Sequence, residues 1–123
     1  MDRYSTPWGL TDYGAGMSVR EERLAANEDF FRRLNERLEE MTPDSSPKLI
    51  VICECADMDC AQRLTLQPGE YERVRAVPTD FVVALDHEDP TIEVIVLRTD
   101  RFEVVRKRGD AGETAEDLDP RGA

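Results

Sequence analysis

The sequence predicts an α+β fold, with a small antiparallel sheet, one short helix and a longer N-terminal amphipathic helix. Three patterns lead to this prediction: a helical apolar repeat over residues 18–41, short β-branched runs between residues 48 and 108, and a polar turn near residue 100. The 123 residues are enough for one domain and too few for two well-packed ones. We therefore expect a single domain over residues 18–108.

The N-terminal helix is predicted over residues 18–41. Ser18 is a suitable N-cap, and Glu21 follows at the spacing of a capping box. Apolar residues recur at steps of three and four and form one stripe: Leu24, Phe31, Leu34, Leu38 and Met41. Pro43 ends the helix, because proline disfavours helical conformation in the residue before it. We expect the stripe to cover the sheet of its own domain. The alternative is a weak homodimer or a partner helix, since only about three heptads fit.

The compact core is predicted over residues 48–108. Short runs of β-branched and apolar residues mark its strands, which are expected at residues 48–53, 63–66, 81–85, 92–98 and 102–107. The polar turn Thr99-Asp100-Arg101 separates the last two runs and favours a hairpin. A short helix is expected over residues 67–76, with Pro68 in its first turn.

The two ends of the chain differ from this core in composition. Residues 1–17 show no periodicity and are expected to be a flexible leader; alternatively, Trp8 forms an aromatic docking segment with Tyr4 and Tyr13. Residues 109–123 hold five acids and one arginine with few apolar side chains. Such a composition cannot bury enough apolar surface to become ordered. We therefore predict a disordered acidic tail.

Charge and hydropathy exclude several classes of protein. The 27 acidic and 16 basic residues give a formal net charge of −11, which opposes binding to the phosphates of nucleic acid. The apolar runs are too short to cross a membrane. The first 17 residues lack the pattern of a secretory signal, so we expect a reduced, cytoplasmic protein.

The three cysteines and the single histidine carry the most information. Cys53, Cys55 and Cys60 form a C-x-C-x4-C segment at the end of a predicted strand, and His87 follows another strand. If these strands are neighbours, the four side chains can form a tetrahedral Cys3His site, which suits Zn²⁺. The alternative is three buried or idle cysteines and a surface histidine.

A zinc site would also stabilise a domain that is otherwise marginal. About 60 core residues bury only about 60% of their unfolded surface. A structural zinc ion contributes on the order of 10 kcal/mol of apparent binding free energy. The metal would fix the turn after the first strand, and Asp86 or Glu88 could hold the second imidazole nitrogen.

Several short motifs give the chain a wider resemblance. They are Asn35-Glu36-Arg37, Cys53-Glu54-Cys55 with Cys60, Glu70-Tyr71-Glu72-Arg73-Val74-Arg75, Phe81-Val82-Val83, His87-Glu88-Asp89-Pro90 and Asp119-Pro120-Arg121. Together they resemble a family of small uncharacterised bacterial proteins common in high-GC Gram-positive lineages. Where that family usually has glycine before the histidine, this chain has Asp86. The resemblance implies that the Cys and His positions belong together, and implies no reaction chemistry.

These observations favour a non-enzymatic role over an enzymatic one. A zinc enzyme needs an open coordination position and a general base, and three thiolates make zinc a weaker Lewis acid. Glu54 is expected to point away from the metal, because neighbouring side chains on a strand alternate. We expect a protein-interaction or regulatory module whose acidic surface suits a basic partner. The alternative is a thiol-based redox sensor that uses the same cysteines.

Overall fold

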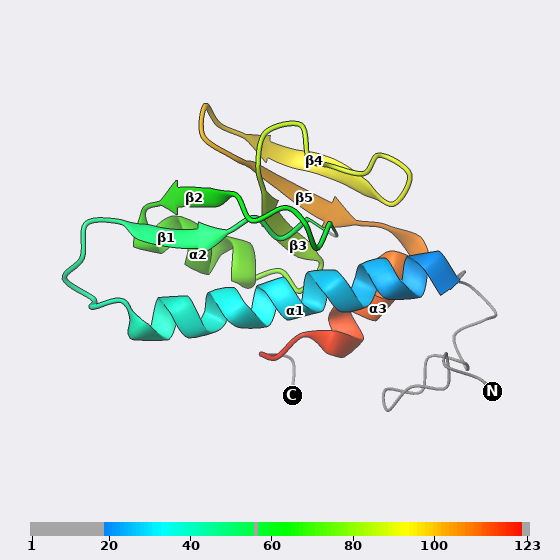
Figure 1. Cartoon of the computed structure of the whole chain (residues 1–123), viewed down its shortest axis with the longest axis horizontal. Coiled ribbons are helices and arrows are strands. Elements are labelled where there is room, and N and C mark those ends of the chain that lie inside the picture. The colour runs from blue at the N-terminus through cyan, green and yellow to red at the C-terminus, as the bar shows by residue number, and fades with distance from the viewer. Residues whose placement is uncertain (1–18, 56, 122–123) are drawn as a thin grey trace.

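The computed structural model describes residues 19–55 and 57–121 and confirms the α+β class (Figure 1). Within these residues it contains three helices and two antiparallel sheets. In chain order the elements are α1 (Val19–Met41), β1 (Leu49–Ile52), β2 (Arg63–Leu66), α2 (Pro68–Arg75), β3 (Asp80–Val83), β4 (Glu93–Arg98), β5 (Glu103–Lys107) and α3 (Gly109–Leu118). The predicted leader and the Ser18 cap lie outside the described residues.

The strands form two sheets where a single one was expected. β1 pairs with β2, and a separate sheet has the order β3-β5-β4. The predicted hairpin between β4 and β5 is confirmed, with the Thr99 N–H donating to the Phe102 carbonyl at 2.9 Å. The chain passes from one sheet to the other directly after β1. There the Cys53 N–H still donates to the Gln62 carbonyl (2.8 Å), whereas the Glu54 N–H donates to the Val82 carbonyl of β3 (2.8 Å).

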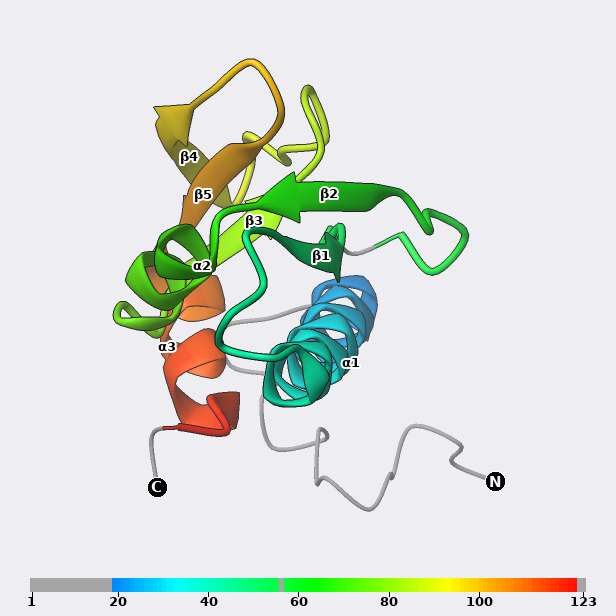
Figure 2. The same cartoon turned by 90° about the vertical axis from the view of Figure 1, so that its left-hand side faces the viewer.

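The helices cover the sheets from different sides. α1 runs along the molecule (Figure 1) and contacts both β1 and α3, while α2 packs on β3 and lies apart from α1 in the end-on view of Figure 2. Between these layers lies one apolar core, built from the inward side chains of β1, β2, β3 and β5 together with Tyr71 and Val74 of α2. All three cysteines belong to this core. No helix among the described residues is long and apolar enough to span a membrane.

The buried face of α1 is mostly polar, in contrast to the apolar stripe expected to cover the sheet. Phe31 is the one buried member of that stripe, and Met41 is 73% exposed. The buried positions of α1 are instead occupied by polar residues, among them Glu28, Arg32 and Asn35. Arg32 donates to main-chain carbonyls of the turn before β3 (2.7 Å) and of α3 (2.9 Å). Hydrogen bonds and ion pairs to distant segments therefore decide which face of α1 turns inward.

The predicted disorder of residues 109–123 is wrong for residues 109–121. Residues 109–118 form α3, whose small buried residues Gly112 and Ala115 allow close packing. Beyond it, Asp119 forms a buried ion pair with Arg75, and Arg121 donates to carboxylates of α1 and α2. The composition argument fails because it required the segment to order itself by apolar burial. Arginines and carboxylates elsewhere in the chain supply the contacts.

Candidate metal centre

The end of β1 and the turn after it position the three cysteines. Cys53 and Cys55 lie on the same side of the extended chain, with Glu54 between them on the other side. The turn brings Cys60 back, with the Cys60 N–H donating to the Asp57 carbonyl at 3.0 Å. Cys53 is fully buried, and the exposed fractions of Cys55 and Cys60 are 7% and 9%.

His87 reaches the same place from the segment after β3. The main-chain N–H of His87 donates to the Ala84 carbonyl at 3.1 Å, and this bond closes a tight turn. Asp86 in this turn has a φ of 66°, in the left-handed region that glycine adopts without steric cost and aspartate tolerates. The turn directs the imidazole toward the cysteines.

The structure brings the four predicted ligands together. Their ligand atoms, three sulfurs and one imidazole nitrogen, all lie within 4.8 Å of one another. The His87 Nδ1 atom lies 3.5 Å from Cys60 Sγ and 3.7 Å from Cys53 Sγ. Zn–S bonds of about 2.3 Å and Zn–N bonds of about 2.0–2.1 Å, at a tetrahedral angle, place sulfur and nitrogen about 3.6 Å apart. The cluster thus has the spacing and the donor types of a four-coordinate metal site.

The other ring nitrogen of His87 contacts a residue that the sequence did not single out. His87 Nε2 lies 3.1 Å from the side-chain amide of Gln62, whereas Asp86 or Glu88 was expected there. When Nδ1 binds a metal, Nε2 carries the proton, so the Gln62 amide must present its oxygen as the acceptor. Gln62 directly precedes β2, and its main-chain carbonyl accepts from the Cys53 N–H at the end of β1. Gln62 therefore contacts two of the four candidate ligand residues, Cys53 through its main chain and His87 through its side chain.

The environment of the sulfurs favours thiolate at one position. The Cys53 thiol donates a hydrogen bond to Cys55, and this bond, with help from His87, lowers the pKa of Cys55 to about 5. The same hydrogen bond and burial raise the pKa of Cys53. The Ala84 N–H donates to Cys53 Sγ at 3.1 Å, which partly offsets this increase in its pKa. A metal ion completes the deprotonation of such a cluster and releases protons when it binds.

Glu54 points away from the cluster, as predicted. It is fully buried and accepts hydrogen bonds from the Val82 N–H (3.0 Å), Asn35 (2.9 Å) and the Tyr71 hydroxyl (3.0 Å). Asn35 also donates to the Ile52 carbonyl (2.7 Å) and accepts from the Ile52 N–H (2.8 Å). Glu54 thus joins α1, α2 and β3 directly behind the cysteines. Its hydrogen-bonded position makes it a structural group and leaves it out of reach as a general base at the metal.

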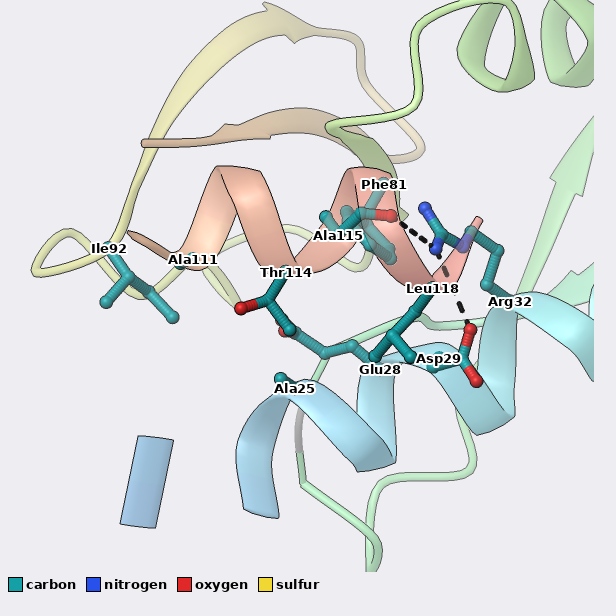
Figure 3. Close-up of a pocket in the computed structure, with 10 residues that line it drawn as sticks. All are labelled: Ala25, Glu28, Asp29, Arg32, Phe81, Ile92, Ala111, Thr114, Ala115 and Leu118. Carbon is teal, nitrogen blue, oxygen red and sulfur yellow. Dashed lines mark hydrogen bonds and ion pairs between the residues drawn. The ribbon is translucent and has the colours of Figure 1, made fainter. Parts of the chain in front are cut away.

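A hollow lies between α1 and α3 (Figure 3). Its volume is about 20 Å³, and Phe81 is one of the residues that line it. Asp29 Oδ1 and Arg32 Nε are buried without a hydrogen-bond partner beside it. A space of this size holds about one water molecule. This hollow is therefore too small for a substrate.

Comparison with protein-family models, with curated proteins and with solved structures gives no match to this chain. The chemistry of the Cys3His cluster therefore follows from its own donor atoms. Three sulfurs and a nitrogen at these distances can hold one metal ion with all four tetrahedral positions filled by protein atoms. Such a set leaves no position for a substrate.

Proposed function

We propose that the protein binds one Zn²⁺ ion through Cys53, Cys55, Cys60 and His87, and that this ion is structural. The observation that carries the proposal is the mutual distance of the four ligand atoms, all within 4.8 Å. Soft thiolate sulfur with imidazole nitrogen in a four-coordinate set favours Zn²⁺ over hard cations such as Mg²⁺.

A structural ion would act where the two sheets meet. Cys53 and Cys55 lie on the segment that leaves β2 and joins β3, and His87 follows β3. One ion would therefore hold the ends of both sheets and the turn between them. Binding energy on the order of 10 kcal/mol is comparable to the whole stability of a small domain. Metal removal should accordingly unfold this region.

We further propose that the folded domain is a non-enzymatic interaction or regulatory module. A closed ligand set and the hydrogen-bonded Glu54 argue against catalysis at the metal. A net charge of −11 suits a partner with a basic surface. Exposed apolar side chains on α1, among them Phe30 and Met41 with exposed fractions of 53% and 73%, offer apolar contact area for such a partner.

The first test is metal analysis of the purified protein. Plasma mass spectrometry should find one zinc per chain, with three thiols protected from a thiol reagent until a chelator is added. Cys55→Ser and His87→Ala should lose zinc and melt at a lower temperature. Met58→Ala is the control, because Met58 lies in the same turn and is 53% exposed. Zinc content and melting temperature unchanged in both ligand variants would refute the site.

The cysteines also support a second candidate, a thiol-based redox sensor. The observation that favours it is the proximity of the Cys53 and Cys55 sulfurs, which lie within 4.8 Å of each other. Hydrogen peroxide would take two electrons from these two sulfurs, form one disulfide and release water and the metal. Loss of zinc and of two thiols at low peroxide, reversed by dithiothreitol, would favour the sensor. Retained zinc would favour a purely structural ion.

A further inference from the structure

β4 is an edge strand with an exposed apolar centre. In the sheet order β3-β5-β4 it pairs with β5, and its other side faces no strand within residues 19–55 and 57–121 (Figure 1). Its four central side chains have exposed fractions between 40% and 51%; they are Val94, Ile95, Val96 and Leu97. The N–H and C=O groups along such an edge are a template for a strand of another chain.

The strand lacks most of the features that protect the edges of natural sheets. Such features include lysine or proline on the edge and β-bulges that distort it. β4 contains neither lysine nor proline, and its two charged residues, Glu93 and Arg98, stand at its ends. It does have a bulge between Ile95 and Leu97. However, this bulge lets Val96 and Leu97, which are consecutive, both line a groove of about 170 Å³ between β4 and α2, so the apolar surface persists.

The order of residues along β4 matches a second copy of the same strand. When two copies pair antiparallel about a two-fold axis, Glu93 faces Arg98 of the second copy, and the four apolar residues between them face one another. A shift of the register by two residues in either direction ends this match. A parallel pair in register would place each charge opposite its like. Cross-strand pairs favour apolar contacts and unlike charges, so the antiparallel arrangement is the one that fits.

Both charged residues already have partners within the chain, which limits what they contribute. Glu93 and Glu28 both contact Lys107, and Arg98 contacts Glu103. Arg98 is still 48% exposed, so it can approach the second copy without losing its own partner. At the Glu93 end, two carboxyl groups surround one ammonium, so no excess of positive charge repels it. We expect apolar burial to drive the association and the charges to select its register.

We propose that the protein forms a homodimer in which the β4 strands of two copies pair antiparallel and join the two three-stranded sheets into one. Main-chain hydrogen bonds along the edge and the apolar pairs on both faces would hold the copies together. The net charge of −11 on each copy opposes this contact, and six residues make a short interface. The dimer should therefore be weak and depend on concentration. None of the Cys3His ligands lies on β4, so the proposal does not depend on the metal.

The test is sedimentation equilibrium of the full-length protein at concentrations up to about 1 mM. An ionic strength of about 0.15 M screens the repulsion between the copies. The mass of the wild type should rise from 14.0 kDa toward twice that value. Val94→Glu and Leu97→Lys should each weaken dimerisation by about tenfold or more, because each buries a charge opposite an apolar side chain. Ile50→Glu is the control, since Ile50 lies on β1 with an exposed fraction of 46%, and it should dimerise as the wild type does. Circular dichroism establishes that each variant is folded.

A mixture of the two β4 variants tests the register. In a dimer of one Val94→Glu chain and one Leu97→Lys chain, the introduced carboxylate faces the introduced ammonium. The mixture should therefore dimerise more tightly than either variant alone. Ile95→Glu is the matched control for the mixture. Ile95 and Leu97 pair with adjacent residues of β5 and so lie on opposite faces of the sheet, and Ile95→Glu should not restore association with Leu97→Lys.

Three outcomes would overturn the proposal. A constant mass of 14.0 kDa at every concentration would show that the chain is a monomer and would leave a strand of another protein as the occupant of this edge. A dimer that persists unchanged in both β4 variants would place the contact elsewhere on the surface. A mixture that regains no association would reject the antiparallel register on which the choice of a second copy depends.

Discussion

The buried acid Glu28 should make the stability of the protein depend on pH in an unusual direction. Its carboxylate and that of Glu93 both contact the Lys107 ammonium between α1 and the β3-β5-β4 sheet. Burial raises the pKa of Glu28 from 4.5 to about 7; Lys107 opposes this increase, and Glu93 and Cys55 add to it. The folded protein therefore holds a proton on Glu28 at pH values where the unfolded chain has lost it.

The sign and size of the effect follow from proton linkage. A pKa raised on folding gives a contribution to stability that is complete below pH 4.5 and is lost as the pH rises through about 7. Each pKa unit corresponds to about 1.4 kcal/mol, so the full effect is about 3 kcal/mol. About 2 kcal/mol of it falls between pH 5.5 and 8. Glu28→Gln removes this titration and should leave a variant whose stability changes less over that range.

The assay is urea unfolding followed by far-ultraviolet circular dichroism at pH 5.5 and pH 8. The lower value stays above the pI, near 4.5, to keep the protein in solution. The wild type should lose about 2 kcal/mol of unfolding free energy relative to Glu28→Gln between the two pH values. Glu113→Gln, at an exposed position on α3, is the matched control and should follow the wild type. If the wild-type and Glu28→Gln values change in parallel, the buried carboxyl is not the titrating group.

Three further variants probe single contacts, one at the candidate metal centre, one behind it and one between α3 and β5. Gln62→Ala removes the partner of His87 Nε2 and should weaken zinc affinity about 10- to 100-fold in a chelator competition, whereas an unchanged affinity would mean that the amide does not orient the ring. Tyr71→Phe removes a hydrogen bond to the buried Glu54 carboxylate and should cost about 1.5–3 kcal/mol in urea unfolding; a cost below about 0.5 kcal/mol would contradict that bond. Gly112→Ala places a Cβ 3.1 Å from a main-chain carbonyl of β5 and should destabilise the fold by about 1–3 kcal/mol, while a neutral result would show that α3 can move aside.

The sequence predicted where most helices and strands lie along the chain, but it did not predict which of their faces are buried or which segments they contact. The helix over residues 18–41 has a clear apolar period and a proline stop, and the structure has α1 at Val19–Met41. Its buried face was predicted wrongly, because Glu28 and Arg32 find their partners in β5 and α3, far along the chain. Local periodicity contains no information on such pairs. The helix at residues 109–118 was missed for the same reason.

The candidate site followed from the sequence because of its ligand types. Sulfur and imidazole are rare enough in this chain that Cys53, Cys55, Cys60 and His87 stood out, and the structure brings them together. Gln62 could not be found in this way, since a glutamine with no distinctive spacing gives no signal.

During synthesis, α1 leaves the ribosome well before the residues that it contacts later in the chain. Glu36 of α1 pairs with Arg121, which is 85 positions later in the chain. At a translation rate of about 5–20 residues per second, the helix waits roughly 4–17 s for this partner. During that interval, much of the face that will be buried presents charged and amide groups to water, so premature association with other chains is disfavoured. Docking of the segment around residue 121 on α1 therefore follows the synthesis of α1 by at least this interval, and protection of α1 from protease should increase once residue 121 has left the ribosome.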